Sequence, residues 1–385
     1  MSDYISIGEA RHIARENRRS IAALEKKRRT EGAANHFTTM RNPDNLVEFD
    51  NLKTYFFTDV GTVKAVDGVS FDVPRGKTVG IVGESGCGKS ITSLSIMQLV
   101  EKPRGQIVGG QIRFAVDEGV YDIVRTPQET MRKIRGNRIA MIFQEPMTSL
   151  NPVLRIGHQV DEVITFHEAD LKARGIIADS DKESVRKRTI EMLELVGISN
   201  AEGVYKMYPH ELSGGMVQRV MISMALACAP SLIIADEPTT ALDVTIQAQI
   251  LDLLRDLKKR INASIMLITH DLGVVAEMAD FVVVMYSGRV VERGTAQDIY
   301  KNPAHPYTLG LMKSKPVLNH HVDRLYSIPG RVPNPVHMPD YCYFRDRCEF
   351  ASDKCAGAYP QEIELSTTHR VSCNRNDIAR GSREG

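Results

Sequence analysis

The chain has 385 residues, which is long enough for about two or three domains and a substantial core. Its composition, 42% hydrophobic and 25% charged, is ordinary for a globular protein, and 49 basic against 48 acidic side chains argue against a general nucleic-acid-binding role. No apolar run approaches the ~18 residues of a membrane-spanning helix, and the first residues lack the apolar core of a signal peptide. We therefore expect a cytosolic protein.

A basic extension, residues 1–45, opens the chain. The apolar residues Ile13, Ile21 and Leu24 form a thin stripe, which predicts a helix, and a loose tether is expected from Gly32 to Asn45. A solvated helix is the simplest interpretation. Contact with anionic lipid or with a partner subunit is the alternative.

Strand patterns follow this extension. Apolar and polar residues alternate over 46–73, with breaks at 59–61 and 67–68, and predict antiparallel strands. Further apolar runs predict buried strands separated by helices, which is typical of an α/β fold with a parallel sheet. These runs cover residues 139–143, 232–235, 265–269 and 281–285.

Two regions depart from this alternation. Residues 151–229 have a helical pattern throughout, and we interpret them as a helical insertion into the α/β core. Prolines become frequent after Val291, which indicates a separate C-terminal element, residues 295–385. The predicted domains are therefore the basic extension, a core over 46–294 and this C-terminal element.

A phosphate loop, G-x-x-x-x-G-K-S, stands directly after the apolar run 79–82. Glycines let backbone N–H groups surround phosphate oxygens, Lys89 neutralises the outer phosphates, and Ser90 offers a hydroxyl to Mg²⁺. The helix expected over 91–100 directs its positive end at the anion. We therefore predict nucleoside triphosphate binding by Gly83, Glu84, Ser85, Gly86, Cys87, Gly88, Lys89 and Ser90.

An acidic pair, Asp236 and Glu237, ends the apolar strand 232–235. Taken alone, such a pair is typical of a solvated turn. In a chain with a phosphate loop, Asp236 is well placed to hold Mg²⁺, directly or through water. Glu237, one residue further on, is predicted to orient or deprotonate the attacking water.

Two more polar residues end predicted strands. Gln144 follows the strand 139–143, where its neutral amide can sense both Mg²⁺ and the attacking water. His270 follows the strand 265–269, and its imidazole can bond the γ-phosphate and brace Glu237. A lone histidine at a strand end is usually structural, so this role depends on its companions.

A second anion site is predicted where Ser213 caps an apolar helix. One chain seldom needs two anion sites for one nucleotide. We therefore expect this segment to close over the nucleotide of another copy or of a homologue, so that hydrolysis needs a dimer. The segment comprises Leu212, Ser213, Gly214, Gly215, Met216, Val217 and Gln218.

Together these motifs resemble the ATP-binding subunit of an ABC transporter. Its Walker A loop, Q-loop, signature, Walker B, D-loop and H-loop are all present in family order between about residues 46 and 294, the D-loop being Ala241, Leu242 and Asp243. The resemblance implies an ABC-type nucleotide-binding fold, with a RecA-like parallel sheet core, an antiparallel β subdomain and a helical subdomain. It also implies an aromatic ring against adenine, for which we choose Tyr55 over Phe56 and Phe57.

Narrower features resemble the oligopeptide, dipeptide and nickel importers, namely residues 143–152, 302–308 and 328–330. This branch implies an energy-coupling ATPase on the cytoplasmic side of the inner membrane, in which the segment after Gln144 meets the membrane subunits. Its partners would be two permeases, a second ATPase, more often a homologue than a copy, and an extracytoplasmic binding protein. Peptides are the first choice of cargo, with nickel, glutathione or oligosaccharides as alternatives.

Two other classes remain as rivals. One is a soluble ABC ATPase that acts on DNA or ribosomes, although such proteins usually carry long coiled coils or a second cassette. The other is a regulatory subunit that binds ATP without hydrolysing it, against which the intact set of Gln144, Glu237 and His270 argues.

Four cysteines crowd the C-terminal element in the spacing C-x5-C-x6-C-x17-C, too open for a zinc ribbon. The spacing resembles the cysteines that the branch uses for a [4Fe–4S] cluster, and structural zinc or free or disulfide-linked thiols are the alternatives. Arg345, Arg347 and Lys354 can offset thiolate charge. The expected ligands are Cys342, Cys348, Cys355 and Cys373.

Overall fold

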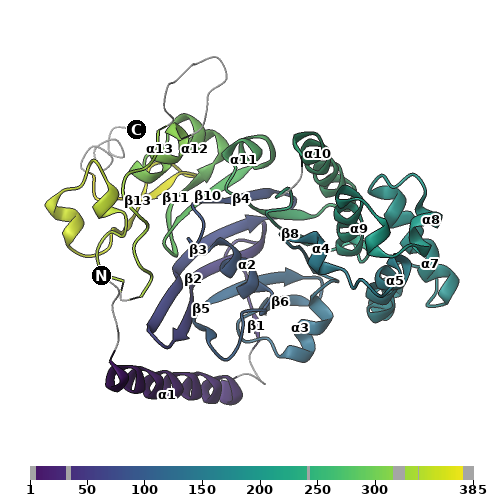
Figure 1. Cartoon of the computed structure of the whole chain (residues 1–385), viewed down its shortest axis with the longest axis horizontal. Coiled ribbons are helices and arrows are strands. Elements are labelled where there is room, and N and C mark those ends of the chain that lie inside the picture. The colour runs from purple at the N-terminus through teal and green to yellow at the C-terminus, as the bar shows by residue number, and fades with distance from the viewer. Residues whose placement is uncertain (1–5, 32–35, 241–242, 315–325, 337, 376–385) are drawn as a thin grey trace. The chain divides into compact units, whose positions relative to one another are not determined.

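The computed structural model describes residues 6–31, 36–240, 243–314, 326–336 and 338–375 (Figure 1). The chain divides into two compact units. The first contains residues 1–73, 79–127 and 269–385, and the second contains residues 74–78 and 128–268.

An antiparallel sheet occupies the N-terminal part of the first unit, in the order β1-β6-β5-β2-β3. The rings of Phe49 and Phe71 stack on its buried face with centroids 4.4 Å apart. The predicted antiparallel strands over 46–73 are confirmed, with a break at residues 59–60 but none at 67–68, where β3 continues. The strands are β1 (Phe37–Thr38), β2 (Asn45–Thr58), β3 (Gly61–Pro74), β5 (Gly105–Val116) and β6 (Gly119–Asp122).

A second set of strands in this unit has the order β12-β13-β11-β10-β4. β10 runs parallel to β4, as expected for an α/β core, and β11 returns antiparallel to β10. β13 pairs with β11, so residues from the C-terminal element contribute strands to this sheet. The strands are β4 (Thr78–Val82), β10 (Phe281–Tyr286), β11 (Arg289–Thr295), β12 (Glu362–Glu364) and β13 (Arg370–Ser372).

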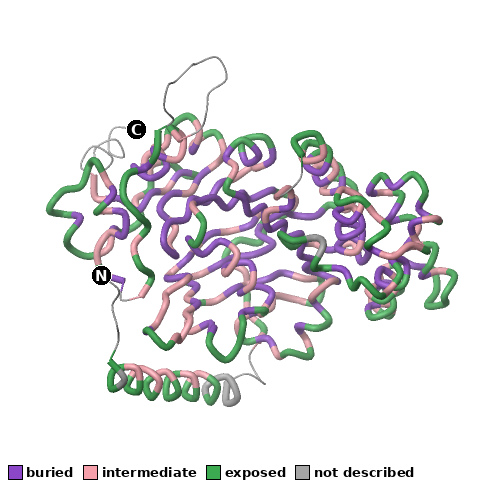
Figure 2. The backbone as a smooth tube through the Cα atoms, viewed as in Figure 1, coloured by how far each residue is buried: buried purple, intermediate pink, exposed green. Residues whose placement is uncertain are grey.

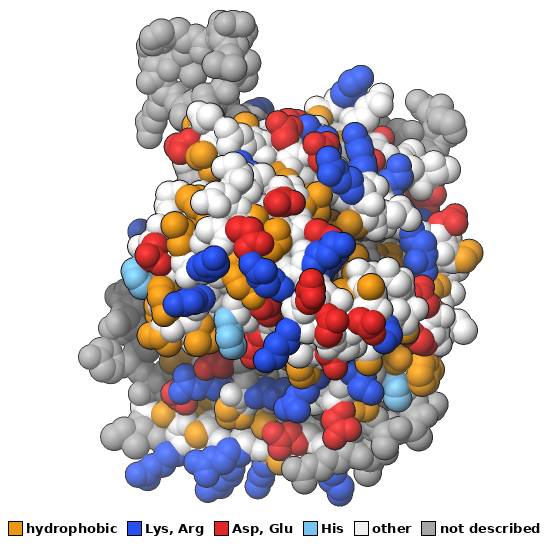
Figure 3. Space-filling view, turned by 90° about the vertical axis from the view of Figure 1, so that its right-hand side faces the viewer, with side chains coloured by type: hydrophobic (Ala, Val, Ile, Leu, Met, Phe, Trp, Pro, Cys, Tyr) orange, Lys and Arg blue, Asp and Glu red, His pale blue; other side chains and the backbone are white. Residues whose placement is uncertain are grey.

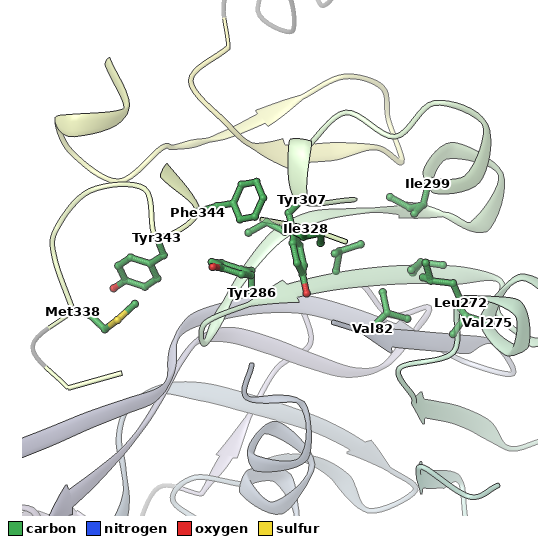
Figure 4. Close-up of a cluster of buried hydrophobic side chains, with 13 residues drawn as sticks. Val82, Leu272, Val275, Tyr286, Ile299, Tyr307, Ile328, Met338, Tyr343 and Phe344 are labelled. Atoms are coloured by element: carbon green, nitrogen blue, oxygen red, sulfur yellow. The ribbon is translucent and has the colours of Figure 1, made fainter. Parts of the chain in front are cut away.

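Helices and aromatic rings cover these strands. A core cluster of this region contains Tyr286, Tyr307 and Phe344, which come from three different segments of the chain (Figure 4). The C-terminal element therefore shares a core with the strands that flank the phosphate loop. The helices are α2 (Lys89–Ile96), α11 (Leu272–Met278), α12 (Ala296–Lys301), α13 (Pro306–Lys313) and the 3-10 turns η2 (Arg345–Arg347) and η3 (Asp353–Ala356).

The second unit contains a parallel sheet in the order β9-β8-β7. Every residue of these strands is buried, which explains why each is a continuous apolar run without alternation. The predicted strands are confirmed to within one residue at each end. They are β7 (Ile139–Ile142), β8 (Leu232–Asp236) and β9 (Ser264–Ile268), with helices α3 (Gln128–Ile134) and α10 (Val244–Ile261).

Between β7 and β8 the chain is helical, as predicted for residues 151–229. The helices are α4 (Pro146–Ser149), α5 (Ile156–Phe166), α6 (Glu168–Ala173), α7 (Lys182–Leu195), α8 (Ala201–Lys206), η1 (Pro209–Glu211) and α9 (Gly214–Leu226).

Acidic and basic side chains are mixed on the face of the molecule in Figure 3, in agreement with the net charge of +1.

The basic extension forms the predicted helix, α1 (Ile7–Glu31), and none of its described side chains is buried (Figure 2). Asn17 Nδ2 donates to the carbonyl of Thr58 at 2.9 Å, which fastens the helix to the end of β2. The predicted tether is wrong in part, because β1 pairs with β6 and β2 already begins at Asn45; residues 32–35 lie outside the described part. No helix among the described residues is long and apolar enough to span a membrane.

Candidate functional site

The phosphate loop connects β4 to α2 and depends on glycine for its shape. Gly88 has a φ of 99°, and a Cβ there would lie 2.3 Å from the carbonyl oxygen of Ala65. Gly83 has a φ of 152°, and a Cβ there would lie 2.2 Å from the carbonyl oxygen of Met285. Side chains at these two positions would collide with backbone, so the loop geometry requires both glycines.

Lys89 closes this loop from inside. Its side chain is buried, and its ammonium group donates to the carbonyl oxygens of Gly83 at 2.7 Å and Glu84 at 3.2 Å. Cys87 is also buried, and this burial raises the pKa of its thiol above the ordinary value. The thiol of Cys87 is therefore neutral near pH 7.

The helix α2 begins at this loop two residues earlier than predicted and ends at Ile96. Its N-cap is Gly88, and no side chain caps its first turn. Backbone N–H groups at such a helix start are suited to bind anions. Ser90 in this first turn is half-buried.

Two residues from the C-terminal half contact the phosphate loop, and sequence reasoning missed both contacts. The hydroxyl of Tyr307 accepts a hydrogen bond from the backbone N–H of Glu84 at 2.7 Å. Arg347 donates to both carboxylate oxygens of Glu84, at 2.7 and 3.0 Å. Arg347 was expected to offset thiolate charge, but in the structure its guanidinium is paired with this carboxylate. Neither contact could be found from spacing, because the partners are 223 and 263 residues apart.

Tyr55 lies on β2 and is half-buried, as are Phe56 and Phe57, so exposure does not separate the three candidates for the adenine ring. Its hydroxyl donates to Asp67 at 2.6 Å. Burial and this bond raise the pKa of Tyr55 above the ordinary value. Arg289 also donates to Asp67, at 2.6 Å, so the ring of Tyr55 is fixed at its hydroxyl end.

His270 belongs to the first unit, two residues before α11 begins, and its side chain is exposed.

In the second unit the structure brings Gln144 and Glu237 together. Gln144 Nε2 donates to Glu237 Oε2 at 3.3 Å, because β7 and β8 are parallel neighbours and their carboxyl ends meet. Thr240 Oγ1 donates to the same oxygen at 3.0 Å.

The acidic pair has two different environments. Asp236 is buried at the end of β8, whereas Glu237 is partly exposed. Glu237 has a φ of 47°, in the left-handed region, and its N–H donates to the carbonyl of Ile268 at 2.8 Å. A non-glycine residue in this conformation costs about 1 to 3 kcal/mol and is common at functional sites, so the surrounding structure fixes the direction of this carboxylate.

The segment 212–218 forms the predicted helix start. Ser213 caps α9, and its hydroxyl accepts from the N–H of Met216 at 3.4 Å. Gly214 and Ser213 are exposed, whereas Gln218 is buried and its amide donates to the carbonyl of Pro238 at 2.7 Å. Leu212 and Gly215 are half-buried. Of the D-loop, Ala241 and Leu242 lie outside the described residues, and Asp243 caps α10 by accepting from the N–H of Ile246 at 2.9 Å.

The four C-terminal cysteines are not arranged as a metal site. Among the described residues, no group of three or more His, Cys, Asp or Glu side chains is placed to hold a metal ion. All four thiols are free, and burial raises the pKa of Cys342 and of Cys373 to about 11 in each case. Neighbouring thiols of the set contribute to both shifts, so the four cysteines lie in one region of the structure.

Three features define an ATPase of the ATP-binding-cassette class. They are a phosphate loop after one parallel strand, an acidic pair at the end of another, and a helix that begins at glycines and is capped by a serine. Residues 66–240 match the family model described as ABC transporter. The chain is 52% identical over 328 residues to the oligopeptide transport ATP-binding protein AppD of Bacillus subtilis, which covers 85% of this chain and 96% of that protein. This chain therefore belongs to the ATP-binding proteins of the ABC transporter family, and it is an ATPase that powers transport.

Other comparisons agree. Residues 291–355 match the model described as oligopeptide/dipeptide transporter, C-terminal region. The oligopeptide transport ATP-binding protein OppD of Bacillus subtilis is 48% identical over 85% of this chain and 87% of that protein. The solved structure of the ATP-binding cassette MJ0796, a dimer bound to ADP and Pi, superposes with a TM-score of 0.55 at 26% identity, over 65% of this chain and 98% of that chain.

Proposed function

We propose that this chain is the energy-coupling ATPase of a multi-subunit importer for dipeptides or oligopeptides, and that it works at the cytoplasmic face of the membrane. The observation that carries the proposal is the likeness to AppD, which extends over nearly the whole of that relative. The match of residues 291–355 to the peptide-transporter C-terminal region supports the same cargo. Nickel, glutathione and oligosaccharides remain the alternative cargoes.

The proposed partners are two membrane permeases, a second ATPase subunit that is a homologue, and an extracytoplasmic binding protein. The exposure of the segment after Gln144 supports permease docking. Val153, which follows the short helix α4, is 76% exposed, and Phe143, directly before Gln144, is 40% exposed. Exposed apolar residues of this kind are typical of a protein interface.

In the proposed mechanism, the phosphate loop binds the β- and γ-phosphates through backbone N–H groups and Lys89. Ser90, Asp236 and Gln144 each carry a side-chain oxygen, the ligand type that suits Mg²⁺, and a bound Mg²⁺ would neutralise phosphate charge. Glu237 orients or deprotonates the attacking water, and the bond that Gln144 Nε2 donates to its carboxylate supports that orientation.

Three further roles complete the proposal. His270 bonds the γ-phosphate, and Tyr55 stacks on adenine with its ring held by Asp67. The helix start of α9, with Leu212, Ser213, Gly214, Gly215 and Gln218, meets the nucleotide of the partner ATPase, together with Asp243. Closing and reopening of the two ATPase subunits around ATP would then move the permeases between their two states.

The cysteine cluster is a separate part of the proposal. Four thiols within one short segment support a [4Fe–4S] cluster, with zinc as the second choice, but their arrangement in the described residues does not fit either metal. No step of the ATPase mechanism depends on the cluster. Stoichiometric iron and sulfide in anaerobically purified protein would establish it, and stoichiometric zinc or metal-free protein would exclude it.

A pull-down from detergent-solubilised native membranes tests the proposed function. Glu237→Gln should lower ATP turnover on the order of a hundredfold, because it removes the base while leaving nucleotide binding intact. With Mg²⁺ and ATP the tagged variant should retain two permeases and a second ATPase. Lys89→Ala, which lacks the charge inside the phosphate loop, is the matched control and should trap no ATP.

Two results would contradict the proposal. Recovery of ribosomes or only soluble partners would favour a non-transport ATPase, and normal turnover of Glu237→Gln would remove this residue from the catalytic role. Uptake of labelled dipeptides, compared with nickel uptake in the same cells, then decides the cargo.

A further inference from the structure

A bidentate ion pair joins the C-terminal element to the phosphate loop. Arg347, on η2, donates through Nη1 and Nη2 to the two carboxylate oxygens of Glu84, at 2.7 and 3.0 Å. Its Nε donates to the carbonyl of Pro329 at 2.9 Å, and Nη1 also lies 3.3 Å from the hydroxyl of Tyr286. The planar guanidinium thus has partners along its whole edge, a geometry that lysine cannot reproduce.

Aromatic rings hold this guanidinium from the protein interior. Arg347 is 8% exposed, and its Cζ lies 5.7 Å from the ring centroid of Tyr286 and 5.9 Å from that of Phe344. Figure 4 shows these rings together with Tyr307, whose centroid lies 4.7 Å from that of Tyr286. A buried charge held in this way stabilises one orientation of its partner carboxylate.

Glu84 is fixed at its backbone as well as at its side chain. Its N–H donates to the hydroxyl of the fully buried Tyr307 at 2.7 Å, and its carbonyl accepts from Lys89 at 3.2 Å. One loop residue therefore connects Arg347 and Tyr307 to the lysine inside the loop. Any shift of the arginine would move the carbonyl groups that position Lys89.

We infer that Arg347 is a positioning residue of the nucleotide site, which acts through Glu84 to keep the phosphate loop and Lys89 in the arrangement that binds ATP. The inference rests on the proposed nucleotide binding at this loop. It extends the nucleotide site to the C-terminal element, which has no phosphate-binding motif of its own.

Arg347→Gln in the full-length chain tests this role, and Arg293→Gln is a matched control. Arg293 makes an equally bidentate pair with Glu362, at 2.7 Å for both bonds, but this pair joins β11 to β12 and includes no phosphate-loop residue. The dissociation constant for a fluorescent ATP analogue with Mg²⁺ and the thermal unfolding midpoint are measured for both variants. Arg347→Gln should weaken binding about tenfold, whereas Arg293→Gln should keep it within about twofold, even where its unfolding midpoint falls.

A double-mutant cycle separates positioning from general loss of structure. Glu84→Gln should weaken binding to a similar extent, and adding Arg347→Gln to it should cost no more than about a further twofold. Arg347→Lys keeps the positive charge but lacks the planar guanidinium that binds both carboxylate oxygens, so it should recover only part of the affinity for ATP. Because Arg347→Lys keeps the positive charge and Glu84→Gln keeps the side-chain volume, these two variants also serve if Arg347→Gln does not fold.

The outcomes distinguish the inference from the proposed function. Wild-type affinity in Arg347→Gln, or an equal loss in Arg293→Gln, overturns the positioning role. If Lys89→Ala loses ATP binding in the same assay while Arg347→Gln does not, the proposed nucleotide site stands and the inference fails. If the wild-type chain binds no ATP analogue, both fail.

Discussion

The helices α2 and α9 both begin at glycine-containing turns, yet their first turns are completed differently. At α2 the N-cap is Gly88 with no side-chain cap, and the surrounding backbone leaves no room for a Cβ. At α9 the hydroxyl of Ser213 caps the helix, and a Cβ built on Gly214 has no described atom within 4 Å other than those of its chain neighbours and its own helix backbone. The difference indicates that the phosphate loop is shaped within its own unit, whereas the start of α9 has space for atoms from elsewhere.

Alanine substitutions at Gly88 and Gly214 should reveal the difference between the two helix starts most strongly. Gly88→Ala should lower the free energy of unfolding by about 3 kcal/mol, because the new Cβ meets the Ala65 carbonyl and the backbone has a positive φ. Gly214→Ala should leave stability within about 1 kcal/mol of wild type, since alanine suits a helix start with open space around it. Chemical denaturation of both variants measures the two effects.

The Gly214→Ala variant also tests the predicted contact with a partner ATPase. In the assembled complex its turnover should fall although the isolated chain is stable, because the added methyl group lies where the partner's phosphate must approach. Normal turnover of the complex would show that α9 does not meet that nucleotide.

Acid should weaken the support of the phosphate loop through His305. This side chain caps α13 by accepting from the N–H of Tyr307 at 3.0 Å, and burial lowers its pKa from 6.5 to about 4, against the opposing effect of Glu292. The folded state therefore keeps His305 neutral while the unfolded chain takes up a proton. This contribution is fully present above pH 6.5 and is lost as the pH falls toward 4, about 2 kcal/mol by pH 5.

The variant His305→Asn isolates that contribution. Asparagine can accept the same capping bond but does not titrate, so the unfolding free energy of the variant should fall less steeply between pH 7 and pH 5 than that of wild type. Equal pH slopes for the two proteins would assign the acid sensitivity to other groups.

The smallest expected effect concerns the cap of α9. Ser213→Ala should lower the free energy of unfolding by about 0.5 to 1 kcal/mol, because the N–H of Met216 loses an acceptor at a distance of 3.4 Å. Ser213→Asn should recover most of this loss in the same denaturation experiment. A loss well above that range would mean that Ser213 has a structural role beyond the cap.

Local patterns were sufficient for most of the fold. The strands β7, β8 and β9 are continuous apolar runs because they are buried on both faces, and the phosphate loop has a sequence that few other structures need. The meeting of Gln144 and Glu237 could be anticipated, since both follow neighbouring parallel strands. Their proposed catalytic roles stay predictions.

The remaining features depend on contacts far apart in the chain or on backbone conformation. The positive φ of Glu237 could not be predicted from the sequence, because the residues that usually indicate a left-handed conformation are glycine and asparagine. The pair of Arg347 with Glu84 was missed because the arginine stood beside the cysteines and its charge was assigned to them. Strand β13 is too short to be predicted from the sequence, and it is recognised by its pairing with β11 and β12.

The separation of 263 residues between Glu84 and Arg347 has a consequence for biosynthesis. At about 5 to 20 residues per second, a ribosome needs about 13 to 50 seconds to proceed from the glutamate to the arginine. During this interval the nascent chain already contains the entire phosphate-loop sequence but not the side chain that orients it. The growing polypeptide therefore acquires its settled nucleotide site only after the segment that contains Arg347 has been synthesised.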